Sequence, residues 1–589
     1  MHITSLLRAA RAGAAACCAV ALASCASTGA ASRAPAADGT ADANPAAVSY
    51  LSGSMDITAY KTRWAYNADY DCYELLRVVY CASPADPAYE SLNIYVPKAY
   101  VVQNGDDGIV FSADSQAGAF TAATAPIILC NGATGWEAGT ARTLDELSRR
   151  VLELDFKACL AEGFVLVSAA SRGPATVSPA DASVYIGKAP NNVTDIKAAV
   201  RFVRANAGRF PGSAERIVSV GTSGAGGMSA IVGASGDSAD FEPYLRDIGA
   251  VMDASDAVFA TMAYCPITEL ENADLGYEWM FTLSEGDEIS AGGMGLPPLP
   301  QKDGKGAKAH KQDAGYRGDS MQGGKKKTVT AFEAALSGDM AAAFERYVAT
   351  LGIGYAEGDG SRYTSDLVSL FESALNTHLA QTYAANGSLD SAAASAYIAS
   401  LNQNGYWLEW DGSRAEIAGV TAEEKKRALV ESGHLARSKD ITGFDAFGYG
   451  AEDKLFCAAD GAPVHFSRSL ADVLTANDAR YRTLGGYTDY TAAFATAASE
   501  DVARRVAMLS PFHYLAQYRA DSTSVRPSPH FRLTVGTADS NASPTAVFDL
   551  GKLAEAAGLE SEYFFLWGAG HGTHDYAGGF VSWVKRICQ

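Results

Sequence analysis

The stretch VSVGTSGAGGMSA, residues 218–230, places a lone serine, Ser223, among four glycines directly after a β-branched run. The run RIVSVG, residues 216–221, has the composition of a buried strand, and the small residues after Ser223 begin a helix. A sharp strand-to-helix turn at the carboxyl end of a strand is typical of an α/β sheet. A serine on such a turn has a strained backbone and an exposed hydroxyl, so its neighbours must be small. The stretch therefore predicts an α/β fold and makes Ser223 a candidate nucleophile; a solvated serine or a phosphate-binding loop are the simpler alternatives.

Other apolar runs predict the rest of the sheet. Strands are expected at residues 125–130, 164–170, 256–264, 530–536 and 561–568. The helix expected at 193–208 has an apolar face that consists of Ile196, Ala199, Val200 and Val203. Strands that alternate with helices indicate a mainly parallel sheet covered on both faces.

This alternation stops between residues 271 and 505, where the sequence becomes helical and polar. One α/β domain is therefore expected in two parts, 49–270 and 506–589, with a large helical insertion at 271–505. Within the insertion, residues 301–327 are basic and glycine-rich, which predicts a surface loop, with a basic docking patch as the alternative.

An acid and a histidine follow the two late strands. Asp539 comes just after 530–536, and His571 comes just after 561–568. The order Ser, Asp, His is the one that an α/β fold needs for a catalytic triad. In that triad His571 would take the proton of Ser223, and Asp539 would orient the imidazole and stabilise its cation. His574 is the alternative base; the string HGTH is not interpreted as a metal site, and no metal or cofactor is expected.

Two backbone N–H groups are expected to stabilise the oxyanion. One is that of Gly224, at the positive end of the helix after Ser223. The second should come from the loop NGATGWEAG, residues 131–139, where Thr134 or Gly135 is favoured.

Several longer strings resemble the bacterial tannase family of α/β-hydrolases. They include SLNIYVP, YIGKAPNNVTDIKAAVRFVRANAGRFPG, GTSGAGGMSAIVGASGDSADFEPYL, AYCPITELENADLGYEWMF and SPFHYL. The resemblance covers both α/β parts and the end of the insertion. It implies an α/β-hydrolase fold, a lid formed by the insertion, the triad Ser223, Asp539 and His571, and cleavage of galloyl or related phenolic esters such as feruloyl ones.

The resemblance also implies residues that recognise phenolic hydroxyls. The lid motif of the family is similar to the string SKDITGFDAFGYGAED in this chain. The lysine of that motif corresponds to Lys439 and its glutamate to Glu452. The alternatives for these two residues are a solvated lysine and a surface carboxylate. Where the family has D-R-D-T-S, this chain has DSNAS, so Asn541 replaces an aspartate. A carboxylate only accepts hydrogen bonds, whereas asparagine also donates. The change predicts a weaker preference for a galloyl ring and better tolerance of a methoxylated one.

The function expected is that of a serine esterase acting on galloyl or related phenolic acyl esters through an acyl-enzyme. The alternatives are a feruloyl or hydroxycinnamoyl esterase, a serine peptidase, and a substrate-binding lipoprotein without catalysis. The small-molecule phenolic ester is the expected partner.

The N-terminus has the features of an export signal. Arg8 and Arg11 precede a short apolar segment within residues 1–24, and LASC at 22–25 resembles the bacterial lipobox, which implies lipidation of Cys25. Residues 25–48 are predicted to be a flexible linker. The chain is therefore expected outside the cell as a surface lipoprotein, with ordinary secretion as the alternative, and to meet the membrane only through its lipid.

Charge excludes another class of partner. The chain has 67 acidic and 47 basic residues, which gives a net charge of −20 and argues against nucleic-acid binding. Seven cysteines remain outside the signal and the proposed lipid site, and most lie in apolar segments as small core residues. Cys72 and Cys81 are the one pair considered for a disulfide.

Overall fold

The computed structural model describes residues 49–290, 326–385, 387–435, 452–457, 461, 463–490, 494–495, 497, 499–575 and 579–589. All of them except Ser49 belong to one compact unit, Tyr50–Gln589. The predictions for Cys25, for Lys439 and for most of the 301–327 loop lie outside the described residues.

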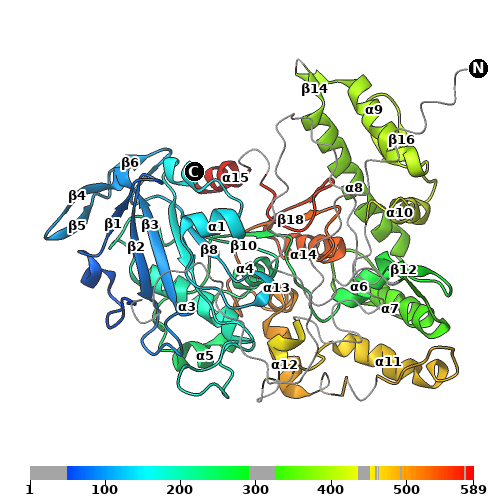
Figure 1. Cartoon of the computed structure of the whole chain (residues 1–589), viewed down its shortest axis with the longest axis horizontal. Coiled ribbons are helices and arrows are strands. Elements are labelled where there is room, and N and C mark those ends of the chain that lie inside the picture. Colours follow the sequence, from blue (N-terminus) through cyan, green and yellow to red (C-terminus); the bar gives the residue numbers. More distant parts are fainter. Residues whose placement is uncertain are drawn as a thin grey trace, which may run out of the picture. The chain divides into compact units, whose positions relative to one another are not determined.

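A nine-stranded sheet forms the centre of this unit, with the order β1-β2-β3-β9-β8-β10-β11-β18-β19 (Figure 1). From β9 to β19 neighbouring strands are parallel, whereas β1, β2 and β3 form an antiparallel edge joined to β9. The strands are β1 (Ala65–Asn67), β2 (Cys72–Val79), β3 (Ser91–Pro97), β8 (Ile127–Asn131), β9 (Val165–Ala169), β10 (Ile217–Thr222), β11 (Ala260–Tyr264), β18 (His530–Gly536) and β19 (Glu560–Leu566). The α/β-hydrolase fold with a mainly parallel sheet is confirmed.

The antiparallel edge is the part of the sheet that the sequence did not predict. β1 is largely exposed and only three residues long. In β2 the pairing register with β3 shifts between Leu75 and Val78, and Arg77 has a φ of 62°. Such a bulge breaks the alternation of inward and outward side chains from which a strand is recognised.

Helices cover the sheet and build the insertion, which is coloured green to yellow in Figure 1. Those of the two α/β parts are α1 (Leu144–Arg150), α2 (Phe156–Ala161), α3 (Asn191–Ala205), α4 (Gly224–Ala234), α5 (Glu242–Asp247), α13 (Pro511–Ala520), α14 (Pro544–Ala556) and α15 (Gly579–Cys588). Those of the insertion are α6 (Ala273–Met280), α7 (Ala331–Thr350), α8 (Gly360–Thr382), α9 (Ser391–Leu401), α10 (Ala422–Glu431), α11 (Arg468–Tyr481) and α12 (Glu500–Met508).

Short antiparallel pairs complete the secondary structure. Two lie in the first α/β part, β4 (Val101–Gly105) with β5 (Gly108–Phe111) and β6 (Gln116–Ala117) with β7 (Phe120–Thr121). Three lie in the insertion, β12 (Glu288–Ser290) with β13 (Lys326–Thr328), β14 (Ala384–Ala385) with β15 (Ser388–Leu389), and β16 (Leu408–Trp410) with β17 (Ala415–Ile417). These strands are two to five residues long, too short to give a clear periodic sequence pattern.

Aromatic contacts join the insertion to the α/β part. The ring of Phe371 on α8 meets that of Phe565 on β19 edge-on, with centroids 4.8 Å apart. Tyr363, also on α8, packs against Phe548 of α14 and donates its hydroxyl to Asp549 at 2.9 Å. One continuous hydrophobic cluster contains residues of both parts, so the insertion shares the core of the domain.

Cys72 and Cys81 are both buried free thiols, so the disulfide considered between them is not formed. Cys72 begins β2 and Cys81 lies two residues beyond its end. An extended strand rises about 3.3 Å per residue, which puts the two cysteines roughly 25–30 Å apart. A disulfide needs Cα atoms within about 7 Å of each other.

A buried ion network fixes α3 to the loop before β11. Lys197 Nζ lies 2.6 Å from Asp256 Oδ1, and Arg201 donates to Asp256 Oδ2 at 2.7 Å. The side chains of Lys197 and Asp256 are completely buried. Removing one partner of such a group leaves the other charges uncompensated in the interior.

We therefore expect Asp256→Asn to lower the free energy of unfolding by about 3–5 kcal/mol, measured by urea denaturation. The matched control is Glu215→Gln, which breaks the 2.6 Å pair between Arg204 and a Glu215 side chain that is 79% exposed. That change should cost less than about 1 kcal/mol. Equal effects of the two substitutions would contradict the role given to the buried network.

Candidate active site

Ser223 lies at the junction between β10 and α4 in a strained conformation, with φ 59° and ψ −128°. Its N–H donates to the carbonyl of Tyr264 at 3.0 Å, and its own carbonyl accepts the N–H groups of Gly227 and Ile267. Only glycine adopts positive φ at little cost, so these hydrogen bonds hold Ser223 in a conformation that it would otherwise leave.

The neighbouring glycines are required by close backbone contacts. A Cβ on Gly221 would lie 2.2 Å from the carbonyl oxygen of Ala225. A Cβ on Gly224 would lie 2.3 Å from the backbone nitrogen of Trp136. Neither position has room for a side chain, which is the physical reason for the glycine-rich stretch around Ser223.

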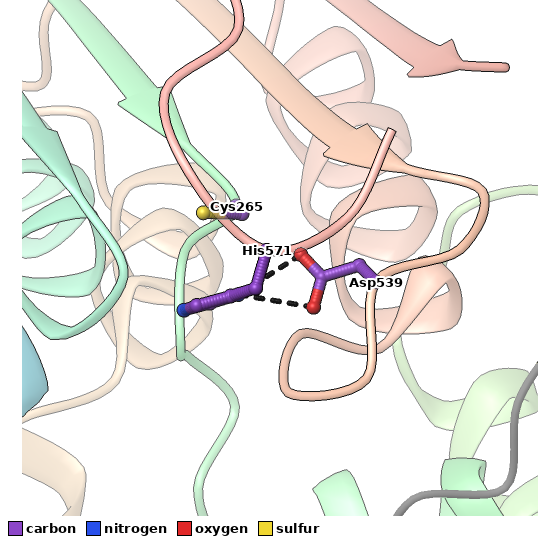
Figure 2. Close-up of side chains that lie close together, drawn as sticks. All are labelled: Cys265, Asp539 and His571. Carbon is purple, nitrogen blue, oxygen red and sulfur yellow. Dashed lines mark hydrogen bonds and ion pairs between the residues drawn. The ribbon is translucent and has the colours of Figure 1, made fainter. Parts of the chain in front are cut away.

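The loops after β18 and β19 bring the predicted acid and base to the serine. His571 Nε2 lies 2.8 Å from Ser223 Oγ. His571 Nδ1 lies 3.0 Å from each oxygen of Asp539, as Figure 2 shows. Asp539 Oδ1 also accepts the N–H groups of Asn541 at 2.8 Å and Ala542 at 2.9 Å. The side chain of Asp539 is fully buried and that of His571 is 21% exposed. The carboxylate is thus fixed by its own loop and in turn orients the imidazole.

Burial and the neighbouring groups act on the pKa of His571 in opposite directions. Burial alone lowers the pKa of His571, but Cys265 and Asp539 raise it through charge and hydrogen bonding, so the pKa lies well above 6.5. This arrangement stabilises the imidazolium that forms when His571 accepts a proton from Ser223.

The oxyanion prediction needs one correction. The N–H of Thr134 already donates to the carbonyl of Gly132 at 3.1 Å, so it is not free for a substrate oxygen. The N–H of Gly135 has no hydrogen-bond partner among the described residues, and a Cβ on Gly224 would lie 3.0 Å from that nitrogen. Gly135, with a φ of 64°, is therefore the better second donor beside Gly224.

His574, the alternative base, is used elsewhere. Its Nε2 donates to the carbonyl of Gly570 at 2.9 Å, within the same loop. It is also absent from the group of Cys265, Asp539 and His571 whose ligand atoms lie close together. His571 is the histidine of the loop that reaches Ser223.

The structure describes two of the three residues expected to recognise substrate, Glu452 and Asn541. Glu452 is buried in a short 3₁₀ helix, Glu452–Phe456. Burial raises the pKa of Glu137, the charge of Lys454 opposes this rise, and the charge of Glu452 adds to it. Asn541 is half-buried beside Asp539. Lys439 lies outside the described residues.

Known proteins share both the local sequence and the fold. Residues 121–280 match the family model described as BD-FAE. The tannase of Lactobacillus plantarum in its orthorhombic crystal is 26% identical, with a TM-score of 0.64 over 88% of this chain and 95% of that one. The chain is therefore similar to bacterial tannases in fold and over most of its length. A tannin acyl hydrolase in complex with ethyl gallate is 25% identical, with a TM-score of 0.63 over 88% of this chain and 94% of that one.

The Fusobacterium nucleatum tannase has the same fold as this tannase-like hydrolase, at 22% identity and a TM-score of 0.63, over 88% of this chain and 95% of that one. No curated protein matches the sequence. In the described part of the tannase-like chain, no helix has both the length and the apolar character needed to cross a membrane.

Thr537 links the two triad loops of the tannase-like hydrolase, a role that the sequence did not reveal. Its Oγ1 accepts the N–H of Gly568 at 2.8 Å, and its N–H donates to the carbonyl of Leu566 at 2.9 Å. Thr537 precedes Asp539 by two residues, and Gly568 precedes His571 by three. The threonine side chain therefore helps to fix the distance between the acid and the base.

His434, from the insertion, completes this contact. Its Nε2 lies 2.8 Å from Thr537 Oγ1, and its ring stacks on Trp567 with centroids 4.0 Å apart. Burial lowers the pKa of His434 to about 4, so the imidazole is neutral at physiological pH. Thr537 Oγ1 accepts the N–H of Gly568, so the hydroxyl proton of Thr537 can be donated to His434 Nε2. The insertion of the tannase-like hydrolase thus takes part in positioning the triad.

We expect Thr537→Val to slow the labelling of Ser223 by a fluorophosphonate roughly tenfold, because it removes two buried hydrogen bonds worth about 1 kcal/mol each. The readout is the second-order labelling rate of the tannase-like hydrolase across pH, with the melting temperature measured in parallel. His434→Phe, which keeps a ring, should act in the same direction, and His434→Gln, which keeps an acceptor, should restore part of the rate.

The control is Thr534→Val on β18, the strand that ends just before Thr537. Thr534 is 5% exposed, and its hydroxyl makes no side-chain hydrogen bond among the residues that the structure describes. Equal labelling rates for Thr537→Val and Thr534→Val would contradict the positioning role of Thr537.

Proposed function

We propose that the chain is a carboxylic ester hydrolase that cleaves phenolic acyl esters, with Ser223 as nucleophile, His571 as base and Asp539 as the acid that orients it. The observation that carries this proposal is the continuous hydrogen-bonded line from Ser223 Oγ through His571 to Asp539, with distances of 2.8 and 3.0 Å. The similarity to tannases and to the BD-FAE family model supports the ester class.

The geometry supports a two-step reaction. Ser223 Oγ attacks the ester carbonyl while His571 Nε2 takes its proton, and the N–H groups of Gly224 and Gly135 stabilise the oxyanion. His571 then returns the proton to the leaving alcohol, which leaves an acyl group on Ser223. Water, activated by the same imidazole, releases the acid and restores the serine. This chemistry requires only side chains, backbone amides and water.

The acyl group is proposed to be an aromatic acid with ring hydroxyls. One similar solved protein, a tannin acyl hydrolase, was determined in complex with ethyl gallate. Asn541, beside Asp539, offers an amide for ring hydroxyls, and the family resemblance assigns the buried Glu452 as an acceptor for them. We propose galloyl esters as one substrate class and feruloyl-type esters as the second, which the uncharged Asn541 favours.

The site of action is proposed from the N-terminal sequence. The segment with Arg8 and Arg11, followed by LASC at 22–25, supports export and lipidation at Cys25. An exported enzyme tethered in this way would meet phenolic esters outside the cell.

Ser223→Ala should lower kcat for methyl gallate and methyl ferulate by roughly 10⁴-fold or more, because no other group supplies the nucleophile. The matched control is Ser229→Ala, a change of another buried serine on α4, which should keep most of the activity. Cleavage of peptides in preference to esters would support a peptidase instead. Tight binding of phenolic esters without turnover by the wild type would support a binding protein.

Asn541→Asp should raise the ratio of kcat/KM for methyl gallate to that for methyl ferulate by roughly ten- to a hundred-fold. The reason is that a charge-assisted hydrogen bond from a ring hydroxyl is worth about 1.5–3 kcal/mol. Using the ratio removes any general effect of a second carboxylate beside Asp539. Asn541→Ala is the control, since it removes the amide without adding charge; an unchanged ratio in Asn541→Asp would refute the role of this residue.

A further inference from the structure

Cys265 is a buried thiol at the active site that the proposed reaction does not use. It follows the last residue of β11, is 1% exposed and has a φ of 36°. Its Sγ lies 3.4 Å from Thr222 Oγ1 and donates to the carbonyl of Gly572 at 3.4 Å. The thiol is therefore held between the residue before Ser223 and the residue after His571. Figure 2 shows Cys265 beside His571 and Asp539. Acyl transfer needs neither a second nucleophile nor a sulfur atom here.

The thiol completes a set of three donor atoms. Cys265 Sγ, a ring nitrogen of His571 and a carboxylate oxygen of Asp539 all lie within 4.8 Å of one another. Sulfur, imidazole nitrogen and carboxylate oxygen are the ligand types that Zn²⁺ takes in proteins. On one tetrahedral Zn²⁺, pairs of such donors are roughly 3.3–3.6 Å apart. A contraction of at most about 1.5 Å would therefore bring all three to one ion.

Charge and burial favour a divalent ion at this position. A Cys265 thiolate and the Asp539 carboxylate together carry two negative charges, which balance one divalent cation in a buried site. The thiol proton leaves to solvent when the metal binds, as for any cysteine ligand. Among the three side chains, only that of His571 is clearly exposed, at 21%, so the ion would enter past the imidazole.

We infer that Cys265, His571 and Asp539 form an inhibitory site for Zn²⁺ and similar thiophilic divalent cations. The metal engages the lone pair that His571 needs as a base and competes with Asp539 for its orienting hydrogen bond, so Ser223 loses its proton acceptor. The fourth coordination position is left for water. The inhibitory effect rests on the proposed function, whereas the binding of the metal does not.

The first test is inhibition of the full chain by Zn²⁺ in a non-chelating buffer. The substrate should be an activated ester without adjacent phenol groups, such as 4-nitrophenyl acetate, because neighbouring hydroxyls of a galloyl ring chelate the metal. Inhibition reversed by EDTA is expected, with no effect of Mg²⁺, which prefers oxygen ligands. In Cys265→Ala and Cys265→Ser, each normalised to its own metal-free rate, half-inhibition should need roughly tenfold more Zn²⁺ or above.

Cys588→Ala is the matched control, since Cys588 is a buried free thiol on α15. This variant should keep the Zn²⁺ sensitivity of the wild type. Equal inhibition of Cys265→Ala and the wild type, or no inhibition of the wild type, would overturn the inhibitory site.

The second test does not depend on activity. Co²⁺ added to Ser223→Ala should produce a near-ultraviolet thiolate-to-cobalt absorption band, and the band should be missing when Cys265→Ala is added to the same variant. A missing band in Ser223→Ala would overturn the metal site. If the wild type hydrolyses no ester, the proposed function fails, but the cobalt band still decides the site.

Discussion

The backbone of Ser223 is the constraint on which the active site depends. Its positive φ aims the hydroxyl away from β10, and the hydrogen bonds to Tyr264, Gly227 and Ile267 maintain that conformation. The same turn frees the first N–H groups of α4 and brings the backbone of Trp136 against Gly224 so closely that no side chain fits between them. Nucleophile, helix terminus and oxyanion loop are therefore parts of one packed junction, and a side chain at either glycine would disturb all three.

The acid and the base are positioned by hydrogen bonds between their two loops. Their loops follow adjacent parallel strands, β18 and β19, and Thr537 bridges them through its side chain. His434 adds a contact from the insertion, which is otherwise joined to the α/β part by aromatic packing. Two of the three triad residues are thus held by a threonine of their own loops and by His434, which lies 103 residues from that threonine in sequence. This contact explains how the insertion can affect the chemistry at the carboxyl ends of the strands.

Much of the fold could be predicted because buried parallel strands are apolar runs with recognisable helices between them. The triad could also be predicted, since Asp539 and His571 directly follow such runs. The antiparallel edge could not, because the bulge near Arg77 breaks the alternation of β2. Which of Thr134 and Gly135 has a free N–H could not be predicted, since the local turn that uses the Thr134 N–H is not revealed by composition. The roles of Cys265 and Thr537 could not be predicted, because the role of a single thiol or hydroxyl depends on which residues surround it in the fold.

The position of the insertion has a consequence for how the chain folds. Ser223 and His571 are 348 residues apart, and β18 pairs with β11 only after the whole segment 271–505 has been made. Until then β11 has one unpaired edge and an apolar surface that can associate with other chains. Closing so long a loop slows the last steps of folding, because its entropy is lost before the strands pair. The triad is thus assembled only when synthesis is nearly complete, so a partly made chain has no hydrolytic activity.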